Sequence, residues 1–349
     1  MLMLTDLHYV LNNVKKDIYT IKNARIFITG ATGFFGKWLL ESFVFLNNEL
    51  DLNIKLFSLS RNPEVFLKQF PYFEKENNIY WIKGDVRNFD FPKEQFDYII
   101  HAATDADAKL NTENPLLMLD TITEGTKRVL EFAKKQNELK SCLFTSSGAV
   151  YGDQPSNVLQ ISETDSFYID INNPNSAYAE GKRLSELYCS IYHSKYEIPI
   201  KIARCFAFVG PYLPLNKHFA IGNFIRDGFL GNNITIKGDG IPLRSYMYTS
   251  DLIIWLLTIM IKGKNCEAYN VGSDKPISIK ELAYKVAEYF PEMSVEILNQ
   301  TLPTDRNHNY VPNTSKVKNE FSINSEISID EAISKTIQFY KSNSKNESS

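Results

Sequence analysis

The sequence predicts an α/β protein: a Rossmann-type, doubly wound parallel sheet with a smaller α/β lobe that binds substrate. Short β-rich runs alternate with helical patterns as far as residue 206, and a glycine turn follows the first run. After residue 206, loops with proline and glycine mix with shorter helices. A chain of 349 residues is long enough for two lobes that share one cleft.

The expected elements follow from these patterns. Strands are predicted at 25–29, 54–59, 79–83, 98–102, 142–147 and 200–206. Helices are predicted at 34–47, 116–136, 176–194, 220–230, 250–262, 278–289 and 329–341, with an amphipathic helix at the N-terminus. We assign 1–203 and 244–262 to the dinucleotide-binding domain, 204–243 and 263–341 to the substrate lobe, and 342–349 to a disordered tail.

Composition excludes several classes of protein. Hydrophobic and charged fractions of 44% and 23%, with a net charge of −3, are typical of a globular protein without a nucleic-acid partner. No apolar run approaches the roughly 18 residues that a membrane span needs, and the N-terminus is a poor signal peptide. Four cysteines without CxxC spacing indicate buried thiols in a reducing cytoplasm, and no metal site is expected.

A glycine turn, Gly30-x-x-Gly33-x-x-Gly36, follows the first strand and begins a helix. In this context glycines let the backbone approach a pyrophosphate at the helix N-terminus, although an ordinary tight turn has the same pattern. The sequence therefore predicts a nicotinamide dinucleotide site. The residues expected to contact it are Gly30, Thr32, Gly33, Phe34, Phe35, Gly36, Ser60, Arg61, Asp85, Val86, Ala102, Ala103, Tyr178 and Lys182.

The end of the second strand bears on the choice between NAD and NADP. A carboxylate there binds the ribose hydroxyls of NAD, whereas arginine pairs with the 2′-phosphate of NADP. The chain has Ser60 and Arg61 at this point, which favours NADP, although Arg61 stacked on adenine would suit either cofactor. Asp85 follows the third strand, where it could meet the adenine amino group or simply form a turn.

Three polar residues predict acid–base chemistry. Tyr178 and Lys182 lie four residues apart and therefore share one face of a helix. The Lys182 ammonium is expected to favour the Tyr178 phenolate and lower its pKa. Ser147, at a strand end, can share the substrate's proton. Together they indicate proton abstraction from a sugar hydroxyl beside a nicotinamide ring.

With these motifs, the chain resembles the extended short-chain dehydrogenases/reductases of the nucleotide-sugar epimerase and dehydratase group, over about residues 22–340. The resemblance rests on the segments GATGFFG, GDVRN, HAAT, TSSGAVYG, YAEGK, ARCFAFVGPY and GDGIPLRSYMYTSDL. The segments EGKR and NKHFAIGNFI further resemble the UDP-glucuronate decarboxylases. The family implies a nucleoside-diphosphate sugar as substrate and a homodimer formed through helices 116–136 and 176–194.

The resemblance also implies roles for single residues. Tyr178 would be the acid/base at the C4 hydroxyl, Ser147 would bond the same oxygen, and Lys182 would bind the nicotinamide ribose. Asn223 and Arg244 would hold the diphosphate, although a helix cap and a surface charge are their plainer interpretations. Asp105 and Asp107 fall where the family often contacts the sugar, or in a solvated loop. Lys237 and His218 are expected to be solvated.

Two departures from the family pattern narrow the reaction. Dehydratases and decarboxylases of this group carry carboxylates just after the strand-end hydroxyl, where this chain has Gly148 and Ala149. Neither residue can transfer a proton. Ala207 also replaces the usual asparagine of the RxxN segment. Hydride transfer at C4 remains, so we expect a 4-epimerase. A 4,6-dehydratase, a decarboxylase, a 4-ketosugar reductase and a non-catalytic dinucleotide sensor are the alternatives.

Overall fold

A seven-stranded parallel sheet forms the centre of the computed structural model, which describes residues 1–104, 108–155, 157–217, 219–299 and 309–346. The strand order is β11-β6-β5-β4-β1-β2-β3, and every pairing is parallel. The strands are β1 (Arg25–Thr29), β2 (Lys55–Ser60), β3 (Ile79–Lys83), β4 (Tyr98–His101), β5 (Ser141–Ser147), β6 (Ile200–Cys205) and β11 (Ala268–Val271). The predicted doubly wound α/β fold is confirmed.

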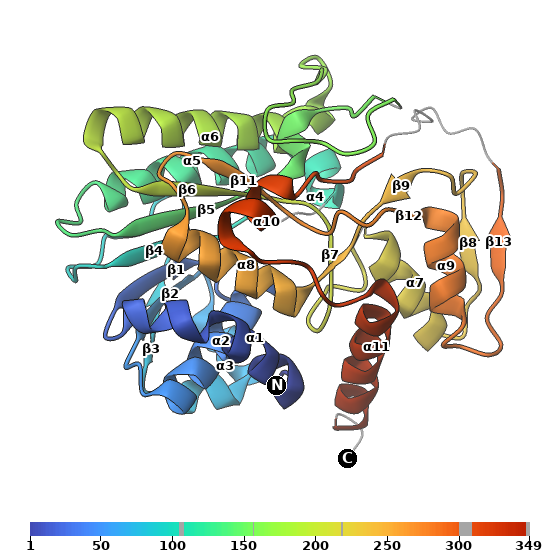
Figure 1. Ribbon diagram of the computed structural model, residues 1–349, viewed down its shortest axis with the longest axis horizontal. Coiled ribbons are helices and arrows are strands. Elements are labelled where there is room, and N and C mark those ends of the chain that lie inside the picture. The colour runs from blue at the N-terminus through green and yellow to red at the C-terminus, as the bar shows by residue number, and fades with distance from the viewer. Residues whose placement is uncertain (105–107, 156, 218, 300–308, 347–349) are drawn as a thin grey trace.

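Helices cover both faces of this sheet (Figure 1). One face carries α5 (Pro115–Ala133) and α6 (Ala177–Tyr196), which pack against each other; the other carries α1 (Leu4–Ile18), α2 (Phe34–Leu50) and α8 (Thr249–Lys262). Strand β1 carries apolar side chains on both faces, so both faces of the sheet must be buried by helices. Ile26 and Ile28 join the core cluster on the α2 and α8 side, whereas Phe27 packs on Phe132 of α5 at 4.9 Å between ring centroids.

The predicted N-terminal helix is confirmed as α1, and two buried carboxylates fix it to later elements. Asp6 accepts hydrogen bonds from the Tyr248 hydroxyl (2.6 Å) and from Lys335 (2.7 Å). Asp251 of α8 accepts one from the Tyr9 hydroxyl at 2.9 Å. Because buried carboxylates need such partners, these bonds join the first helix to the last third of the chain.

The smaller lobe lies beside the sheet (Figure 1). Its elements are α7 (Ala220–Phe229), β8 (Ile234–Ile236), β9 (Leu243–Arg244), β12 (Ile277–Ser278), α9 (Ile279–Ala287) and β13 (Val295–Ile297). The remaining elements are α3 (Pro63–Gln69), α4 (Ala108–Glu113), β7 (Phe208–Val209), β10 (Met247–Tyr248), α10 (Ser315–Phe321) and α11 (Ile329–Asn346).

Two segments differ from the sequence expectation. Strand β11 lies within 263–341, which we assigned to the smaller lobe, yet it pairs with β6 and completes the central sheet. Helix α11 continues to Asn346, five residues into the tail expected to be disordered. Extending an existing helix fixes one residue per added hydrogen bond, so polar residues prolong it at little cost.

Candidate active site

A cavity of about 250 Å³ opens at the carboxyl ends of β1, β2 and β4. It is lined by residues expected to contact a dinucleotide, namely Gly30, Thr32, Gly33, Ser60, Arg61, Asp85, Val86, Ala102 and Ala103. Gly30 has φ of +73°, and a Cβ there would lie 2.5 Å from the Ala102 carbonyl oxygen. The close approach of β1 to β4 at this point therefore requires glycine.

The start of α2 suits an anion. Gly33 is the N-cap and provides no side-chain acceptor, so the first N–H groups of the helix are left for another partner. Gly36 has a different role, since a Cβ there would lie 2.3 Å from the carbonyl oxygens of Gly30 and Ala31. It keeps the turn tight against the helix. The cradle and the uncapped helix end fit a dinucleotide pyrophosphate.

A second cavity of about 320 Å³ continues from this turn to Tyr178 and Lys182. Phe34 and Phe35 line it, as expected from the sequence, and Lys37 and Lys217 add two cations. Burial lowers the pKa of Lys37 to about 8, against the opposing effect of the Glu41 carboxylate. The two cavities share Gly30, Thr32 and Gly33, so together they describe one elongated groove along the strand ends.

Asp85 has a partner that the sequence analysis missed. Arg87 donates two guanidinium hydrogen bonds to its carboxylate, at 2.9 and 3.0 Å, and the Arg87 backbone N–H donates a third at 2.9 Å. These bonds hold the pKa of Asp85 below its ordinary value. Arg61 is exposed at the end of β2 and contributes in the same direction. Two arginines, rather than one, thus line the cavity near Ser60.

Ser147 and Tyr178 meet where the groove reaches the smaller lobe. Ser147 ends β5 and is 6% exposed, and it lines the same two cavities as Tyr178. The Tyr178 backbone N–H donates to Asn111 Oδ1 at 3.1 Å, which fixes the start of α6. Burial raises the pKa of Tyr178 to about 12, and the neighbouring Ser147 hydroxyl works against that rise.

The expected lowering of the Tyr178 pKa by Lys182 is therefore wrong for this structure. Lys182 is 2% exposed and directs its ammonium elsewhere: Nζ donates to the Thr145 carbonyl (2.8 Å) and to Thr104 Oγ1 (3.1 Å). Burial lowers its own pKa to about 8, although Glu186, one turn further along α6, favours the charged form. His101, buried beneath it, has a pKa lowered to about 3 by burial and stays neutral.

A third cavity of about 550 Å³ lies between the sheet and the smaller lobe. Ser147 and Tyr178 belong to its lining as well, so these two residues border both the groove and this cavity. Arg244 lines it, as expected for a substrate-binding residue. Ala149 and Ala207, the two alanines that depart from the family pattern, also face it. A cavity of this size is large enough for a small-molecule ligand.

Among the described residues, no other residue predicted to bind substrate is found in the lining of this cavity. Asn223 lies inside α7 and is not among the residues that line this cavity; its Oδ1 accepts from Arg226 at 3.0 Å. It caps no helix, because the N-cap of α7 is Phe219. Lys237 is exposed. Asp105, Asp107 and His218 lie outside the described residues.

Tyr246 and Tyr310 also line this cavity and were missed by the sequence analysis. Both come from segments far along the chain from Tyr178. Tyr310 reaches the site because its backbone N–H donates to the Leu243 carbonyl at 2.9 Å, beside β9. Its ring packs on Phe206, with centroids 4.7 Å apart. No local sequence pattern predicts that Tyr246 or Tyr310 reaches the cavity, because their positions depend on long-range pairing.

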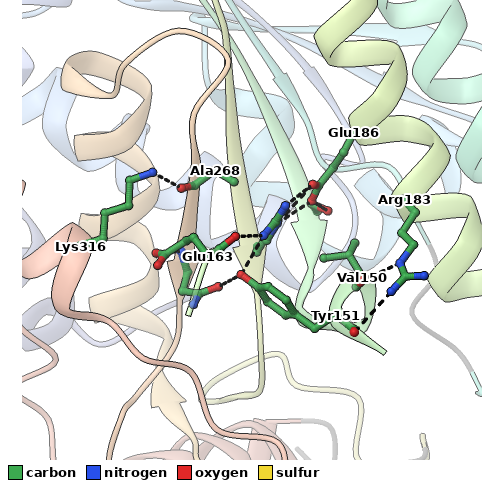
Figure 2. A network of polar contacts seen from close by, with 10 residues as sticks. Val150, Tyr151, Glu163, Arg183, Glu186, Ala268 and Lys316 are labelled. Carbon is green, nitrogen blue, oxygen red and sulfur yellow. Dashed lines mark hydrogen bonds and ion pairs between the residues drawn. The ribbon is translucent and has the colours of Figure 1, made fainter. Parts of the chain in front are cut away.

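A buried polar network holds the end of β5 in place (Figure 2). The Glu186 carboxylate accepts from Ser146 Oγ at 2.6 Å and from Arg204 at 2.7 Å. Arg204 also donates to the Tyr151 hydroxyl at 3.0 Å, and Tyr151 donates to Asn270 of β11 at 2.5 Å. Such charge-assisted bonds join α6, β5, β6 and β11 directly beneath the site.

The comparisons with known proteins agree with this geometry. The model of the NAD dependent epimerase/dehydratase family matches residues 26–272, which is more than half of the chain. The chain belongs to this family. It is thus an enzyme of the extended short-chain dehydrogenase/reductase type, which works with a nicotinamide dinucleotide.

Relatives and structural neighbours differ in their reactions. The chain is 28% identical over 305 residues to UDP-glucuronic acid decarboxylase 6 of Arabidopsis thaliana, covering 85% of this chain and 82% of the relative. UDP-glucose 4-epimerase of Thermotoga maritima has a TM-score of 0.77 at 20% identity, covering 91% and 99%. UDP-glucuronic acid 4-epimerase of Bacillus cereus has a TM-score of 0.78 at 21% identity, with the same coverage. At these identities, the similarity to the two epimerase structures shows that this chain has the same fold.

Within residues 1–104, 108–155, 157–217, 219–299 and 309–346, no helix is long and apolar enough to cross a membrane. Over the same part of the chain, no group of three or more His, Cys, Asp or Glu side chains could hold a metal ion.

Proposed function

We propose that this enzyme is an NADP-dependent 4-epimerase of nucleoside-diphosphate sugars. The observation that carries the proposal is the position of Ser147 and Tyr178, which border both the dinucleotide groove and the 550 Å³ cavity. A sugar whose C4 faces this border would lie within reach of both hydroxyls. Gly148 and Ala149, next along the chain, offer no acid for expelling water.

The residues divide the chemistry between them. A nicotinamide bound in the groove would supply the hydride acceptor for C4 and the hydride donor for re-reduction on the opposite face of the ketosugar. Tyr178 takes the proton of the C4 hydroxyl and gives it back on re-reduction, so no proton is gained or lost overall. Ser147 hydrogen-bonds the same oxygen. Lys182, held by Thr104 and Thr145, is the residue we assign to the nicotinamide ribose.

Arg244 is the residue we assign to the substrate's diphosphate. It lines the 550 Å³ cavity from β9, and burial lowers the pKa of its guanidinium, which remains far above neutral for arginine. A planar guanidinium donates two parallel hydrogen bonds to phosphate oxygens. Such a contact would orient the nucleotide so that the sugar reaches Ser147 and Tyr178.

The preference for NADP rests on the end of β2. Ser60 and Arg61 line the groove where a 2′-phosphate would lie, and no carboxylate accompanies them at this strand end. We assign Arg61 to the phosphate because it follows Ser60 directly at this strand end and lines the groove there.

A homodimer through α5 and α6 is also part of the proposal. Apolar side chains on these helices remain exposed in the single chain: Leu116 is 72% exposed, Leu187 55%, and Leu184 and Ile191 38% each. Leu184, Leu187 and Ile191 follow the three- and four-residue spacing of one helix face. A second copy of the same surface would cover this stripe.

Decarboxylation of a nucleoside-diphosphate uronate is the second candidate. It is favoured by the similarity to UDP-glucuronic acid decarboxylases, which extends over 85% of the chain. Oxidation at C4 is common to both reactions, since a ketone at C4 also activates a neighbouring carboxylate for loss. The two candidates therefore differ in the product and not in the first step.

The test is a panel of UDP-, GDP-, CDP- and dTDP-linked hexoses and hexuronates, with products followed by NMR. We expect inversion at C4 with the carbon skeleton intact. Release of carbon dioxide from a hexuronate would establish the second candidate instead, and a 4-keto-6-deoxy product would refute both.

A single substitution tests whether Tyr178 is the residue that carries out the reaction. Tyr178→Phe keeps the ring and removes the phenol, so turnover should fall at least about a hundredfold, as is typical when a general acid–base is lost. Binding of NADP, measured by calorimetry, should stay within about twofold of the parent protein. An active Tyr178→Phe enzyme would contradict the assignment.

A further inference from the structure

The helix that carries Tyr178 begins without a side-chain cap of its own. Ser176 is the N-cap of α6, but its backbone is helical (φ −72°, ψ −7°) and its side chain accepts no N–H group of the helix. Its hydroxyl donates instead to the Asp170 carbonyl at 2.6 Å. The first N–H groups of a helix have no partner within the helix, so the Tyr178 N–H needs one from another part of the chain.

Asn111 of α4 supplies that partner. Its Oδ1 accepts the Tyr178 N–H at 3.1 Å, and its Nδ2 donates to the Asn175 carbonyl at 2.6 Å. An N–H group can only donate and a carbonyl can only accept, so these two bonds allow one orientation of the Asn111 amide. We call this pair of bonds the Asn111 clamp. It joins α4 to the residues just before and just after the start of α6.

The Asn111 clamp lies at the proposed active site. Asn111, Asn175 and Tyr178 all line the 550 Å³ cavity, together with Ala108. Leu110, on the same short helix, lines the dinucleotide cavity of about 250 Å³. Helix α4 therefore borders the proposed sites of both ligands, and the clamp connects this helix to the residue that we assign as the acid/base.

We propose that Asn111 is a positioning residue for the reaction, because it holds the start of α6 and so keeps the Tyr178 phenol at the border of the groove and the 550 Å³ cavity. The inference rests on the proposed function, in which Tyr178 exchanges the proton of the C4 hydroxyl. Tyr178 is the second residue of α6, and helix ends fray unless they are held. A reacting group that is misplaced by about 1 Å can lose on the order of a hundredfold in rate.

Asn114 offers a matched control on the neighbouring helix. It is the N-cap of α5, and its Oδ1 accepts the Leu117 N–H at 3.1 Å. Like Asn111, it satisfies a first-turn N–H group with its side-chain amide, but it caps its own helix and is not among the residues that line the 550 Å³ cavity. Its removal should therefore destabilise the protein and leave Tyr178 in place.

The first measurement compares the kinetics of Asn111→Ala and Asn114→Ala on the nucleotide sugar that the panel identifies. Asn111→Ala should lower kcat about ten- to a hundredfold and change KM less than about threefold. Asn114→Ala should keep kcat within about twofold of the parent while it lowers Tm. A raised KM with unchanged kcat in Asn111→Ala would overturn the proposal, because Asn111 would then only line the cavity. Equal losses of kcat in the two variants would overturn it as well.

The second measurement asks whether Asn111 acts through Tyr178. If it does, the two substitutions do not add, and Asn111→Ala should change kcat less than about twofold when Tyr178→Phe is already present. A further tenfold loss in the double variant, as a rough threshold, would contradict the proposal, because it would show that Asn111 affects the reaction by another route.

The third measurement requires no turnover. Backbone hydrogen exchange is followed by NMR on protein labelled with ¹⁵N-tyrosine, and the Tyr178 signal is assigned by its loss in Tyr178→Phe. The parent should protect the Tyr178 amide, and Asn111→Ala should reduce this protection about tenfold, whereas Asn114→Ala should not. An unprotected Tyr178 amide in the parent would overturn the inference.

Failure of the proposed function gives a different result from failure of this inference. A protein that converts no nucleotide sugar, but protects the Tyr178 amide through Asn111, would refute the proposed function and leave the Asn111 clamp standing. A protein that inverts C4 with full kcat in Asn111→Ala would refute this inference alone.

Discussion

Lys182 carries a buried ammonium. The variant Lys182→Met tests whether burial of this charge lowers the free energy of unfolding of the protein. Folding lowers the Lys182 pKa from 10.5 to about 8, chiefly because burial penalises the charged form. At ~1.4 kcal/mol per pKa unit, the ammonium costs the folded state about 3 kcal/mol at neutral pH. Methionine has a similar length and no charge, so the variant avoids this cost while losing catalysis.

The pH dependence separates this cost from other effects of the substitution. Methionine also loses the bonds to Thr104 and Thr145, which costs roughly 1–3 kcal/mol at any pH. Between pH of about 8 and 10.5 the unfolded chain keeps the Lys182 proton and the folded protein does not. The stability of the parent, relative to Lys182→Met, therefore rises with pH across this window and is lowest below it.

Thermal unfolding of the cofactor-free proteins, followed by calorimetry from neutral to alkaline pH, measures this difference. An unfolding entropy of about 2.1 cal/mol/K per residue gives ~0.7 kcal/mol/K for the whole chain, so 3 kcal/mol corresponds to about 4 °C. Other titrating groups are common to both proteins and cancel in the difference. Parallel Tm curves for parent and variant would refute the reasoning, because they would show that Lys182 folds without a pKa shift.

Two further predictions concern the cofactor and the assembly. Arg61→Ala should weaken NADP binding about 10- to 100-fold by calorimetry and change NAD binding little, because only NADP has the 2′-phosphate; equal losses would remove the argument for NADP. Leu187→Glu should convert a dimer to a monomer in sedimentation velocity, whereas Leu230→Glu, at a residue 65% exposed after α7, should not. A parent protein that is monomeric at micromolar concentration would contradict the proposed interface.

The parts of the site that the sequence predicts are those with local signals. The glycine turn is visible because its spacing and the strand before it determine the backbone geometry at Gly30. Tyr178 and Lys182 share a helix face for the same local reason. The alternation of strands and helices predicts six of the sheet's strands, but β11 is only four residues long and joins the sheet by long-range pairing with β6.

Other features depend on contacts that a sequence pattern does not contain. Tyr310 enters the site through pairing beside β9 and Ile161, so its position follows from the tertiary fold. The direction of the Lys182 ammonium is set by Thr145 of β5 and by Thr104 in the segment after β4. Asn223 has the expected residue type, but its bond to Arg226 within α7 occupies the amide oxygen.

The central claim is that hydride leaves and returns at C4 while the rest of the sugar stays intact. The most direct measurement is conversion of a nucleotide hexose or hexuronate deuterated at C4, with the product analysed by NMR and mass spectrometry. The account predicts a C4-inverted product that keeps the deuterium at C4 and loses neither water nor carbon dioxide. A product that has lost carbon dioxide or water, or inverted sugar without the label at C4, would contradict it.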